Sequence, residues 1–579
     1  MADKPAGGSR GPAATNLAVG AAVLVLLVPL LLKAASGAPP TAAEFAPNAD
    51  QVIKHAPPGQ GVDATGTGGQ PTPAASPGAS KAAVTPTAGP TTLSIPQDRL
   101  RACVGPPPLR QIEDPQSPPC VQYWLGKDNG GATWAGVTRD TVYISIPTPD
   151  NTDADYLALQ NFFNKRFEFY GRKLKFEFCD SNANKADQAT QNADAAAAAK
   201  GCNGPKPFAS TFYRSDNGRY YNQTMACRYH VVTAASYLAY EHTYLNRCAP
   251  YLYQYPMEAQ QMFTTTGDWM CSRLAGQPAI HGSGVDSQAR SINTQRRKFG
   301  ILVSPTYFDD PVAQQATIAG MRERLRACGS AVDDKDVIIN PVDYAAGQTG
   351  VTADPASATN AVLRMKQDNV TTIACLCNLF AYGALARAAS GQAYHPEWLV
   401  STYGGMDCSF CITLGGPPSD QLADTFGLTF QPRQIRPELD PYNMAVHEGD
   451  PSRSQQTEAG LLANREEDYR PLLLLASGIQ MAGPNLTPAT FRAGLLRTTF
   501  PNPITVTHAG AVGFSPSSWG MTTDAAEWWW SNTAIGPYSD SSASPGTLCY
   551  VDAGRRRTIG EFPTREHDPF FTGTCDSGR

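Results

Sequence analysis

The chain has 579 residues, which is too long for one hydrophobic core and long enough for two lobes of ordinary domain size. Its 46 basic and 51 acidic residues nearly balance, and no basic stripe is interleaved with aromatic residues. Nucleic-acid binding is therefore not expected, because neutralising phosphates requires clustered Lys and Arg.

The most apolar segment lies near the start of the chain, where an uncharged run extends from Leu17 to Leu32. Flanking alanines lengthen this run to the ~20 residues that span a bilayer. Basic residues precede it, which places residues 1–12 in the cytoplasm, a transmembrane anchor at 13–35 and the bulk of the chain on the extracytoplasmic side of the cell membrane. A signal peptide cleaved at the small residues 36–38 is the alternative.

Residues 36–99 are rich in Pro, Ala, Gly and Thr, with Phe45 as the only aromatic residue. Such a segment has too little apolar surface to offset the entropy lost on ordering. We expect it to be a disordered tether. Residues 100–135 would then form an N-terminal extension that a disulfide pins to the fold.

Two later stretches, Thr138 to Pro149 and Arg296 to Thr306, open in the same way. Each runs from charged residues through an apolar strand to a turn that proline breaks. After the second, Asp310 can cap a helix that starts with Pro311. After the first, apolar residues recur at the three- and four-residue spacing of one helical face, namely Tyr156, Leu159, Phe163, Phe167 and Tyr170.

The alternation of strands and helices continues through the second half of the chain. It comprises a strand at Val337–Ile339, a helix around Asp354–Gln367, a strand at Val370–Cys377, a helix ending at Ala389 and a strand at Leu399–Thr402. This order predicts an α/β protein with two similar lobes, each a mostly parallel sheet flanked by helices. We place lobe 1 at 136–295, lobe 2 at 296–425, a crossover that completes both lobes at 426–510 and a C-terminal extension at 511–579.

Several weak motifs accompany this order: residues 136–142 (GVTRDTV), 169–174 (FYGRKL), 425–429 (TFGLT) and 483–491 (GPNLTPATF). Together they resemble the type I periplasmic-binding-protein family, in particular the branched-chain amino-acid type of substrate-binding proteins of ABC importers, in a membrane-anchored actinobacterial variant. The resemblance covers roughly residues 136–500. It implies a two-lobed fold with three hinge crossings, a small bound ligand and an ABC permease as partner. Members with a lipid anchor carry a Cys just after the apolar run, and this chain has none before Cys103.

Ligand-binding candidates follow the ends of predicted strands, where open α/β sheets bind ligands. In lobe 1 the hydroxyl groups would suit a carboxylate or another anion; these residues are Ser210, Thr211, Thr233 and Ser236. In lobe 2 an aromatic wall with an acid would suit an amine or a hydroxylated ligand; these residues are Tyr307, Asp309, Asn378, Phe380, Tyr403 and Asp407. For each residue, a turn that satisfies its own backbone is the alternative interpretation.

All 14 cysteines lie beyond the tether, between Cys103 and Cys575, as expected for a disulfide set outside the cytoplasm. Close spacing in the sequence makes three pairings feasible: Cys103 with Cys120, Cys248 with Cys271, and Cys549 with Cys575.

Four more cysteines have a spacing that could support metal binding or redox chemistry: Cys375 and Cys377 on a strand, followed by Cys408 and Cys411. We favour two disulfides that reach from the strand to the Cys408 loop, and a tetrahedral zinc site is the alternative. A redox role is less favoured, because no helix is expected after Cys411 to stabilise a thiolate.

Catalytic signatures such as GxSxG, HExxH and a P-loop are absent from the sequence. His447 beside Glu448 could act as a base, although structural pairs of this kind are far more common. Trp528, Trp529 and Trp530 either pack in a core or stack on a sugar, and packing is favoured. We expect neither an enzyme nor a cofactor or metal.

The sequence therefore predicts a membrane-tethered, extracytoplasmic solute-binding protein in which hinge closure holds a small polar, amino-acid-like ligand for import. A receptor or envelope assembly component that reuses the binding fold is one alternative. An envelope enzyme that processes amides or glycans is another.

Overall fold

The structure is a computed structural model. It describes residues 103–104, 110–111, 113–148, 154–181, 187–202, 204–213, 218–235, 239–304, 311–342, 354–401, 406–453, 468–497, 499–500, 512–537, 545–564 and 568–579. The predicted anchor at 13–35 and tether at 36–99 lie outside these residues. Among the helices that are described, none is long and apolar enough to cross a membrane.

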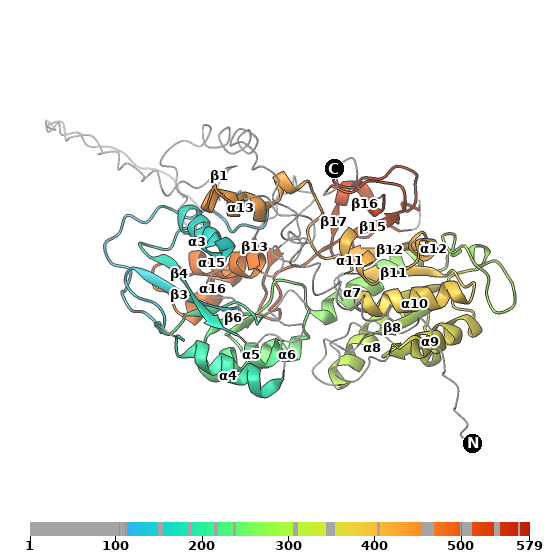
Figure 1. Ribbon diagram of the computed structural model, residues 1–579, viewed down its shortest axis with the longest axis horizontal. Helices are drawn as coiled ribbons and strands as arrows, with labels where there is room; N and C mark the ends of the chain where they lie inside the picture. The colour runs from blue at the N-terminus through green and yellow to red at the C-terminus, as the bar shows by residue number, and fades with distance from the viewer. Residues whose placement is uncertain are drawn as a thin grey trace, which may run out of the picture.

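Two α/β lobes lie side by side along the long axis of the molecule (Figure 1). The sheet of the first lobe consists of parallel strands in the order β4 (Lys173–Asp180), β3 (Thr141–Thr148), β5 (Ala209–Ser210), β6 (Val232–Ala234) and β7 (Leu252–Tyr253). In chain order the strands read 2-1-3-4-5, which is a doubly wound arrangement with its switch point between β3 and β5.

The second lobe repeats that arrangement. Its parallel strands follow the order β9 (Val337–Ile339), β8 (Phe299–Val303), β10 (Thr372–Leu376), β11 (Glu397–Ser401) and β12 (Thr425–Thr429). This is again 2-1-3-4-5, with the switch point between β8 and β10. The structure thus confirms two lobes with parallel sheets flanked by helices.

Antiparallel strands from near the end of the chain complete the second sheet. β15 (Ala525–Ser531) pairs with β12, and both β16 (Thr547–Tyr550) and β17 (Arg556–Arg557) pair with β15. The sequence assigned this segment to an extension, whereas the structure makes it part of the second lobe. Two short two-stranded sheets lie outside the lobes' main sheets; they pair β1 (Cys103–Val104) with β2 (Arg110–Gln111) and β13 (Thr499–Phe500) with β14 (Val512–Gly513).

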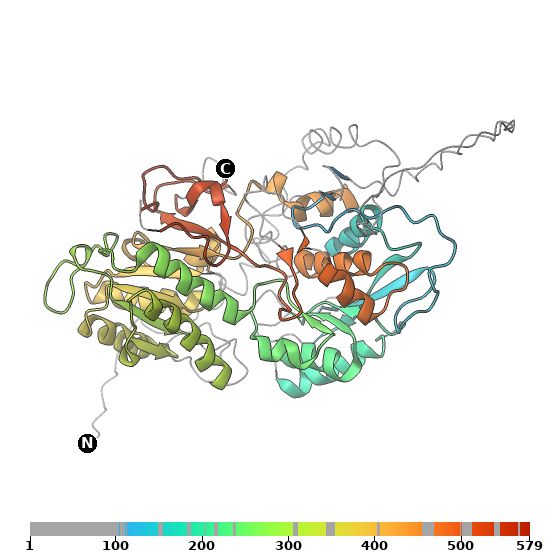
Figure 2. The ribbon, with the colours of Figure 1, turned by 180° about the vertical axis from the view of Figure 1, so that it is seen from behind.

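Helices cover both sheets (Figures 1 and 2). In the first lobe they are α3 (Ala154–Arg166), α4 (Gln188–Ala199), α5 (Arg219–Gln223), α6 (His242–Arg247), α13 (Pro441–Gly449), α15 (Arg470–Ala482) and α16 (Pro488–Arg497). In the second lobe they are α7 (Ala259–Trp269), α8 (Pro311–Ala327), α9 (Pro355–Gln367), α10 (Leu379–Gly391), α11 (Ser409–Leu414) and α12 (Ser419–Leu422). Helix α7 packs against α8 and so belongs to the second lobe, although the sequence placed its residues in the first.

Shorter helical turns complete the elements of the described residues. Two are π-helical, η3 (Thr224–Arg228) and η4 (Met270–Leu274). Four are 3-10 turns, at η5 (Ile292–Thr294), η7 (Asp334–Asp336), η8 (Pro437–Leu439) and η10 (Val551–Gly554).

Local sequence explains where several elements begin and end. The Asp354 carboxylate accepts hydrogen bonds from the N–H groups of Ala356 and Ser357, and Pro355 occupies the first turn, so α9 begins where the sequence predicted. Helix α3 buries Tyr156 and Phe163 on the predicted face.

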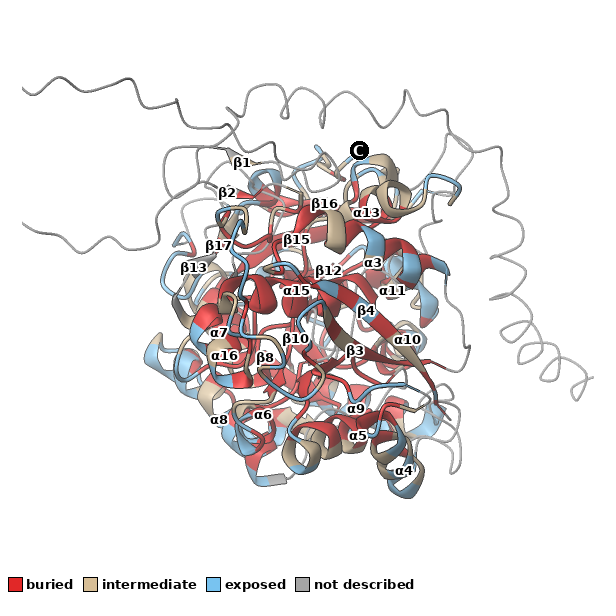
Figure 3. Cartoon of the chain, turned by 90° about the vertical axis from the view of Figure 1, so that its left-hand side faces the viewer, coloured by how far each residue is buried: buried red, intermediate tan, exposed pale blue. Residues whose placement is uncertain are grey.

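The core of each lobe lies between its sheet and its helices (Figure 3). Aromatic side chains dominate the first lobe, where Phe163 stacks on Tyr469 at 5.9 Å between ring centroids. In the second lobe β15 buries Trp528, Trp529 and Trp530, which are 0%, 6% and 3% exposed. The packing interpretation of these tryptophans is therefore confirmed.

All 14 cysteines form disulfides. The predicted pairs Cys103–Cys120 and Cys549–Cys575 are confirmed. The predicted pair of Cys248 with Cys271 is wrong, because the first lies beside α6 in lobe 1 and the second beside α7 in lobe 2. The remaining cross-links between separate elements are Cys227–Cys248, Cys271–Cys328 and Cys179–Cys202.

The strand and loop cysteines bond locally rather than to each other. Cys375 pairs with Cys377 and Cys408 with Cys411, so the predicted bridges between strand and loop do not form. A helix, α11, begins at Ser409 inside the second pair. The expectation that no helix accompanies this motif is therefore wrong.

Candidate ligand-binding site

The repeated strand order defines one functional edge in each lobe. In an open doubly wound sheet, ligands bind outside the carboxyl ends of the strands, at the switch point of the order. In the first lobe this point lies where β3 and β5 end, at Thr148 and Ser210. In the second lobe it lies where β8 and β10 end, at Ser304 and Asn378.

Chain connectivity places these two edges at the junction of the lobes. Strand β7 leads at its carboxyl end directly into Gln254–Glu258, which cross to α7 of the second lobe. Strand β12 leads from its carboxyl end through Phe430–Asp440 to α13 of the first lobe. Residues 514–524 make a third crossing, back to β15. The three hinge crossings implied by the resemblance are therefore present.

Two of these crossings run side by side and are bonded to each other. The N–H of Gln254 donates to the carbonyl of Trp519 at 3.0 Å, and the N–H of Met521 donates back to Gln254 at 3.0 Å. A Cβ on Gly520 would come within 2.7 Å of the Pro256 carbonyl oxygen, so the close approach of the two segments needs glycine at this position.

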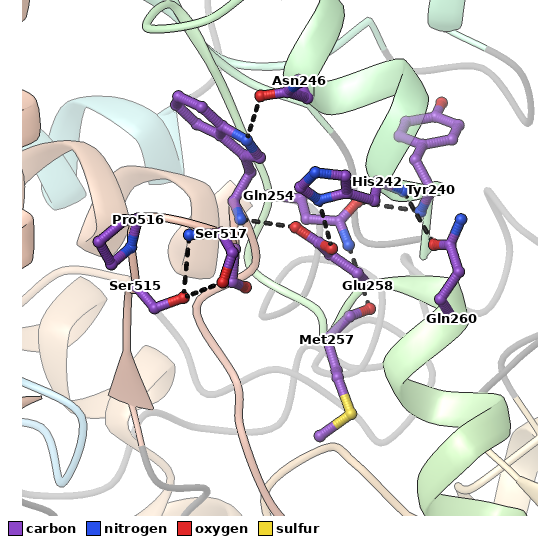
Figure 4. A network of polar contacts seen from close by, with 12 residues as sticks. Tyr240, His242, Asn246, Gln254, Met257, Glu258, Gln260, Ser515, Pro516 and Ser517 are labelled. Atoms are coloured by element: carbon purple, nitrogen blue, oxygen red, sulfur yellow. Dashed lines mark hydrogen bonds and ion pairs between the residues drawn. The ribbon is translucent and has the colours of Figure 1, made fainter.

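Side chains at this junction tie the crossings to lobe 1 (Figure 4). The buried Glu258 carboxylate accepts the N–H of Trp519 at 2.6 Å and lies 3.0 Å from Nδ1 of His242 on α6. The indole N–H of Trp519 donates to Asn246, also on α6, at 3.2 Å. The Gln254 amide binds the Tyr240 N–H at 2.9 Å. One carboxylate therefore joins both crossings and a lobe 1 helix.

Three of the lobe 1 candidates lie together on or directly after the paired strands β5 and β6: Ser210, Thr211 and Thr233. The Ser210 hydroxyl donates to the Thr211 carbonyl at 2.8 Å and lies 3.1 Å from the Tyr221 hydroxyl. Burial raises the pKa of Tyr221 to about 12, so this hydroxyl stays protonated at neutral pH. Thr233 lies within β6 rather than after a strand, and its hydroxyl donates to the Val231 carbonyl at 2.9 Å, so it is used within the backbone of its own strand.

Thr211 differs from its neighbours. It is 1% exposed, and its Oγ1 has no hydrogen-bond partner among the residues that the structure describes. Its N–H is occupied by the Ser145 carbonyl at 3.1 Å. A buried hydroxyl without a partner costs about 1–3 kcal/mol. Thr211 is therefore the lobe 1 candidate with hydrogen-bonding capacity left for a ligand.

Two of the lobe 2 candidates form hydrogen bonds within the protein. The Asn378 side chain caps α10 by accepting the Ala381 N–H at 2.9 Å, and Asp407 accepts a hydrogen bond from the Thr429 hydroxyl. Phe380, in the first turn of α10, is partly buried. These contacts fix the carboxyl edge of the second sheet.

Four other predicted ligand residues lie outside the described part of the chain: Ser236, Tyr307, Asp309 and Tyr403.

Sequence reasoning missed two lobe 2 residues that share the property of Thr211. Ser401, at the end of β11, is 2% exposed, and Gln314, in α8 directly after β8, is 6% exposed. Ser401 Oγ and Gln314 Nε2 have no hydrogen-bond partner within the described residues. Ser401 is the last residue of β11, but the sequence placed it inside a strand predicted to end at Thr402, so it was not considered among the residues that follow a strand. Gln314 is inside a helix, where strand ends give no signal.

A buried ion pair also lies at the lobe 1 edge. Arg219, the first residue of α5, donates to Glu241 at 2.9 Å, and both side chains are nearly inaccessible. The guanidinium lies 5.1 Å and 4.8 Å from the ring centroids of Tyr240 and Tyr244. A buried pair surrounded by aromatic rings holds its partners in fixed positions, so it can orient the surrounding strand-end loops.

One hollow of about 380 Å³ lies at the same edge of the second lobe. It is lined by polar groups after β9 and at the start of α9, including Asn340, Asp354, Ser357 and Arg364. The described His, Cys, Asp and Glu residues do not gather into a group that could hold a metal ion. Glu448, for which the sequence favoured a structural role beside His447, forms ion pairs with Lys165 and Arg166.

No protein-family model matches this sequence, and no curated protein matches it. Solved structures do resemble it. A solute-binding protein of an ABC transporter from Rhodopseudomonas palustris BisB5, in complex with 3,4-dihydroxy benzoic acid, is 12% identical with a TM-score of 0.46, over 72% of this chain and 97% of that one. A leucine-binding protein from Thermotoga maritima MSB8 is 10% identical with a TM-score of 0.43, over 67% and 95%.

A fatty acid ABC transporter substrate-binding protein from Thermomonospora curvata is 13% identical with a TM-score of 0.45, over 74% of this chain and 95% of that one. Two of these neighbours are binding proteins of ABC transporters, and the third is a leucine-binding protein.

Proposed function

We propose that the chain is an extracytoplasmic solute-binding protein that holds a small polar ligand between two hinged lobes. One observation carries the proposal. The same doubly wound strand order occurs twice, and both copies turn a carboxyl edge toward a junction of three crossing segments; each edge carries buried polar groups that have no hydrogen-bond partner among the described residues.

The chemistry of these groups indicates the class of ligand. Thr211 Oγ1 and Ser401 Oγ can donate or accept, and Gln314 Nε2 donates. All three are neutral and buried, so a ligand that bridges the lobes gains by offering both hydrogen-bond acceptors and donors, as amino acids and amides do. Each contact would also remove the cost of about 1–3 kcal/mol that a partnerless buried group carries without ligand.

The hinge gives the binding event a mechanical consequence. Because the crossings share hydrogen bonds with each other and with α6, the lobes can rotate about this junction while each sheet stays intact. A ligand that contacts both edges binds the closed arrangement more tightly than the open one, and it shifts the population by that difference in affinity. An ABC-type permease would recognise and bind the closed form. The anchor at 13–35 and tether at 36–99 would hold the protein at the membrane.

A ligand panel tests this function. Thermal unfolding of the purified protein is measured with amino acids, amides and sugars, and each compound is assayed for turnover. We expect at least one compound to raise the melting temperature without being consumed, because a ligand that binds only the folded state stabilises it. Turnover of a stabilising compound would contradict a pure binding function.

One observation favours a second candidate, a receptor or assembly component. The segment that follows the tether is bonded into lobe 1 beside the hinge, where Asp114 accepts from Arg470 at 2.9 Å and Arg470 lies 5.6 Å from the ring centroid of Tyr255. Movement of the hinge crossing that contains Tyr255 would thus be transmitted through Arg470 and Asp114 to the segment that follows the tether. This candidate would be favoured if no compound in the panel raised the melting temperature and the protein specifically retained a membrane protein partner.

A further inference from the structure

The disulfides fall into two groups by the length of chain that they close. Five join cysteines 17 to 57 residues apart. The other two, Cys375–Cys377 and Cys408–Cys411, join cysteines two and three residues apart. A disulfide restricts the unfolded chain less when its loop is shorter, so these two contribute least to the fold.

The surroundings of the Cys408 sulfur differ from those of several other cysteine sulfurs. It accepts a hydrogen bond from the backbone N–H of Cys411 at 2.8 Å. By contrast, the sulfurs of Cys271, Cys328 and Cys377 lie 2.8, 3.2 and 3.7 Å from backbone carbonyl oxygens. An N–H donor favours a thiolate, whereas a carbonyl oxygen repels one.

Cys179 is the closest comparison, since the Ser145 hydroxyl lies 3.5 Å from its sulfur. That contact is longer, and the disulfide of Cys179 closes a loop of 23 residues. Among the described cysteines, Cys408 therefore combines the shortest donor contact to sulfur with a minimal loop.

Accessibility separates the two local disulfides. Cys375 and Cys377 are both 0% exposed, so neither sulfur can be approached. Cys408 is 4% exposed, while Cys411 is only partly buried. An incoming thiolate can therefore reach the Cys411 end, and the buried Cys408 is left as the group that departs.

We propose that Cys408–Cys411 is a site of thiol–disulfide exchange with a dithiol of a partner protein. A partner thiolate attacks Sγ of Cys411, the Cys408–Cys411 bond breaks, and its electron pair stays on Cys408 as a thiolate that keeps the Cys411 N–H. The partner's second thiolate then attacks its own sulfur in the mixed disulfide and releases Cys411. Two electrons pass from the partner dithiol to this chain, two protons complete the thiols of Cys408 and Cys411, and the partner leaves as a disulfide.

Graded reduction of the whole chain tests this site. The folded protein is incubated with dithiothreitol at neutral pH, quenched with iodoacetamide and mapped by mass spectrometry. We expect Cys408 and Cys411 to be alkylated at least ~10-fold faster than two matched controls. Cys375–Cys377 matches the short loop but is buried, and Cys271–Cys328 matches the partial exposure but lies against carbonyl oxygens. Equal rates for the three disulfides, or slower reduction of Cys408–Cys411, would overturn the proposal.

Single variants test the direction of attack. In Cys408→Ser the sulfur of Cys411 remains reachable and should form a mixed disulfide with oxidised glutathione. In Cys411→Ser the buried Cys408 should react at least ~10-fold more slowly. Faster reaction of Cys408 than of Cys411 would contradict the assigned roles. This experiment does not depend on the ligand, so its failure leaves the solute-binding proposal untouched.

Discussion

The two ends of the second sheet are built from opposite kinds of polar contact. At the amino end, Arg297 forms two hydrogen bonds of 2.7 Å with Glu397, and Glu397 also accepts from Thr372 at 2.6 Å. At the carboxyl end, Ser401 Oγ and Gln314 Nε2 are buried without a partner in the described chain. Glu397 and Ser401 are the first and last residues of the same strand, β11.

This contrast assigns stability to one end and function to the other. A buried ion pair whose hydrogen bonds are all made fixes the strands but has no capacity left for a ligand. Partnerless buried hydroxyl and amide groups weaken the fold but can bind something from outside. The comparison predicts that substitutions at the amino end change unfolding, and that those at the carboxyl end change binding.

The largest effect is expected at the ion pair. Replacing Glu397 with Ala leaves Arg297 buried and uncompensated, which should lower the free energy of unfolding by about 3–5 kcal/mol. Denaturant unfolding measures this. As a control, Lys335→Ala removes the exposed pair with Asp368 and should cost less than about 1 kcal/mol. Similar losses in the two variants would contradict the role of the amino end.

A second effect at the amino end depends on pH. Burial raises the pKa of Asp424, which accepts a hydrogen bond from Ser283, to about 7. The folded state then binds a proton that the unfolded state releases near pH 4, so this group's contribution to stability is full below pH ~4 and is lost as pH rises to about 7. In Asp424→Asn this loss should disappear, making the variant more stable than the natural protein at pH 8 by on the order of 2 kcal/mol. Unfolding curves that depend on pH equally in both proteins would contradict this.

The hinge should show a smaller effect on stability. Glu258→Ala leaves the buried Trp519 N–H without its acceptor, and this should cost about 1–3 kcal/mol. Because the same carboxylate joins α6 to the crossings, ligand affinity should fall as well. Unfolding and ligand titration of the same preparation measure both quantities. His242→Ala removes only the partly exposed imidazole that pairs with Glu258, so it should lower the free energy of unfolding by less than Glu258→Ala does. Equal losses would show that the Trp519 contact is unimportant.

The smallest effect on stability is expected at the carboxyl ends. Thr211→Val and Ser401→Ala remove hydroxyls that have no described partner, so the free energy of unfolding should change by less than ~0.5 kcal/mol or should rise. Affinity for the ligand found in the panel should fall about 10-fold or more, since a lost hydrogen bond of ~1.4 kcal/mol is tenfold. Ser210→Ala, whose hydroxyl is already bonded within the protein, is the control for stability. Unchanged affinity in both variants would remove these residues from the site.

The sequence predicted the fold correctly where nearby residues determine where a helix or strand begins or ends. Asp354 and Pro355 mark the start of α9, and the apolar runs before 149 and 306 mark β3 and β8. The sheet order could not be read directly, because β15 joins β12 from almost 100 residues away. Pairing Cys248 with Cys271 failed for the same reason, since nearness along the chain does not reveal that a hinge crossing separates them.

The candidate site was predicted only in part. Thr211 could be found because it follows a strand, yet the sequence could not separate it from Ser210, whose hydroxyl is used internally. That distinction depends on which neighbours reach each oxygen in the folded lobe. Gln314 lies within a helix and reaches the carboxyl edge only because α8 starts there.

The distance between the lobes tests the central claim most directly. Fluorophores placed through unnatural amino acids at two exposed positions, Leu157 near the start of α3 and Val312 near the start of α8, report that distance by energy transfer. We predict that a compound that raises the melting temperature also increases the transfer efficiency, with both effects saturating at the same ligand concentration. A stabilising compound that leaves the efficiency unchanged would contradict closure of two hinged lobes on a ligand.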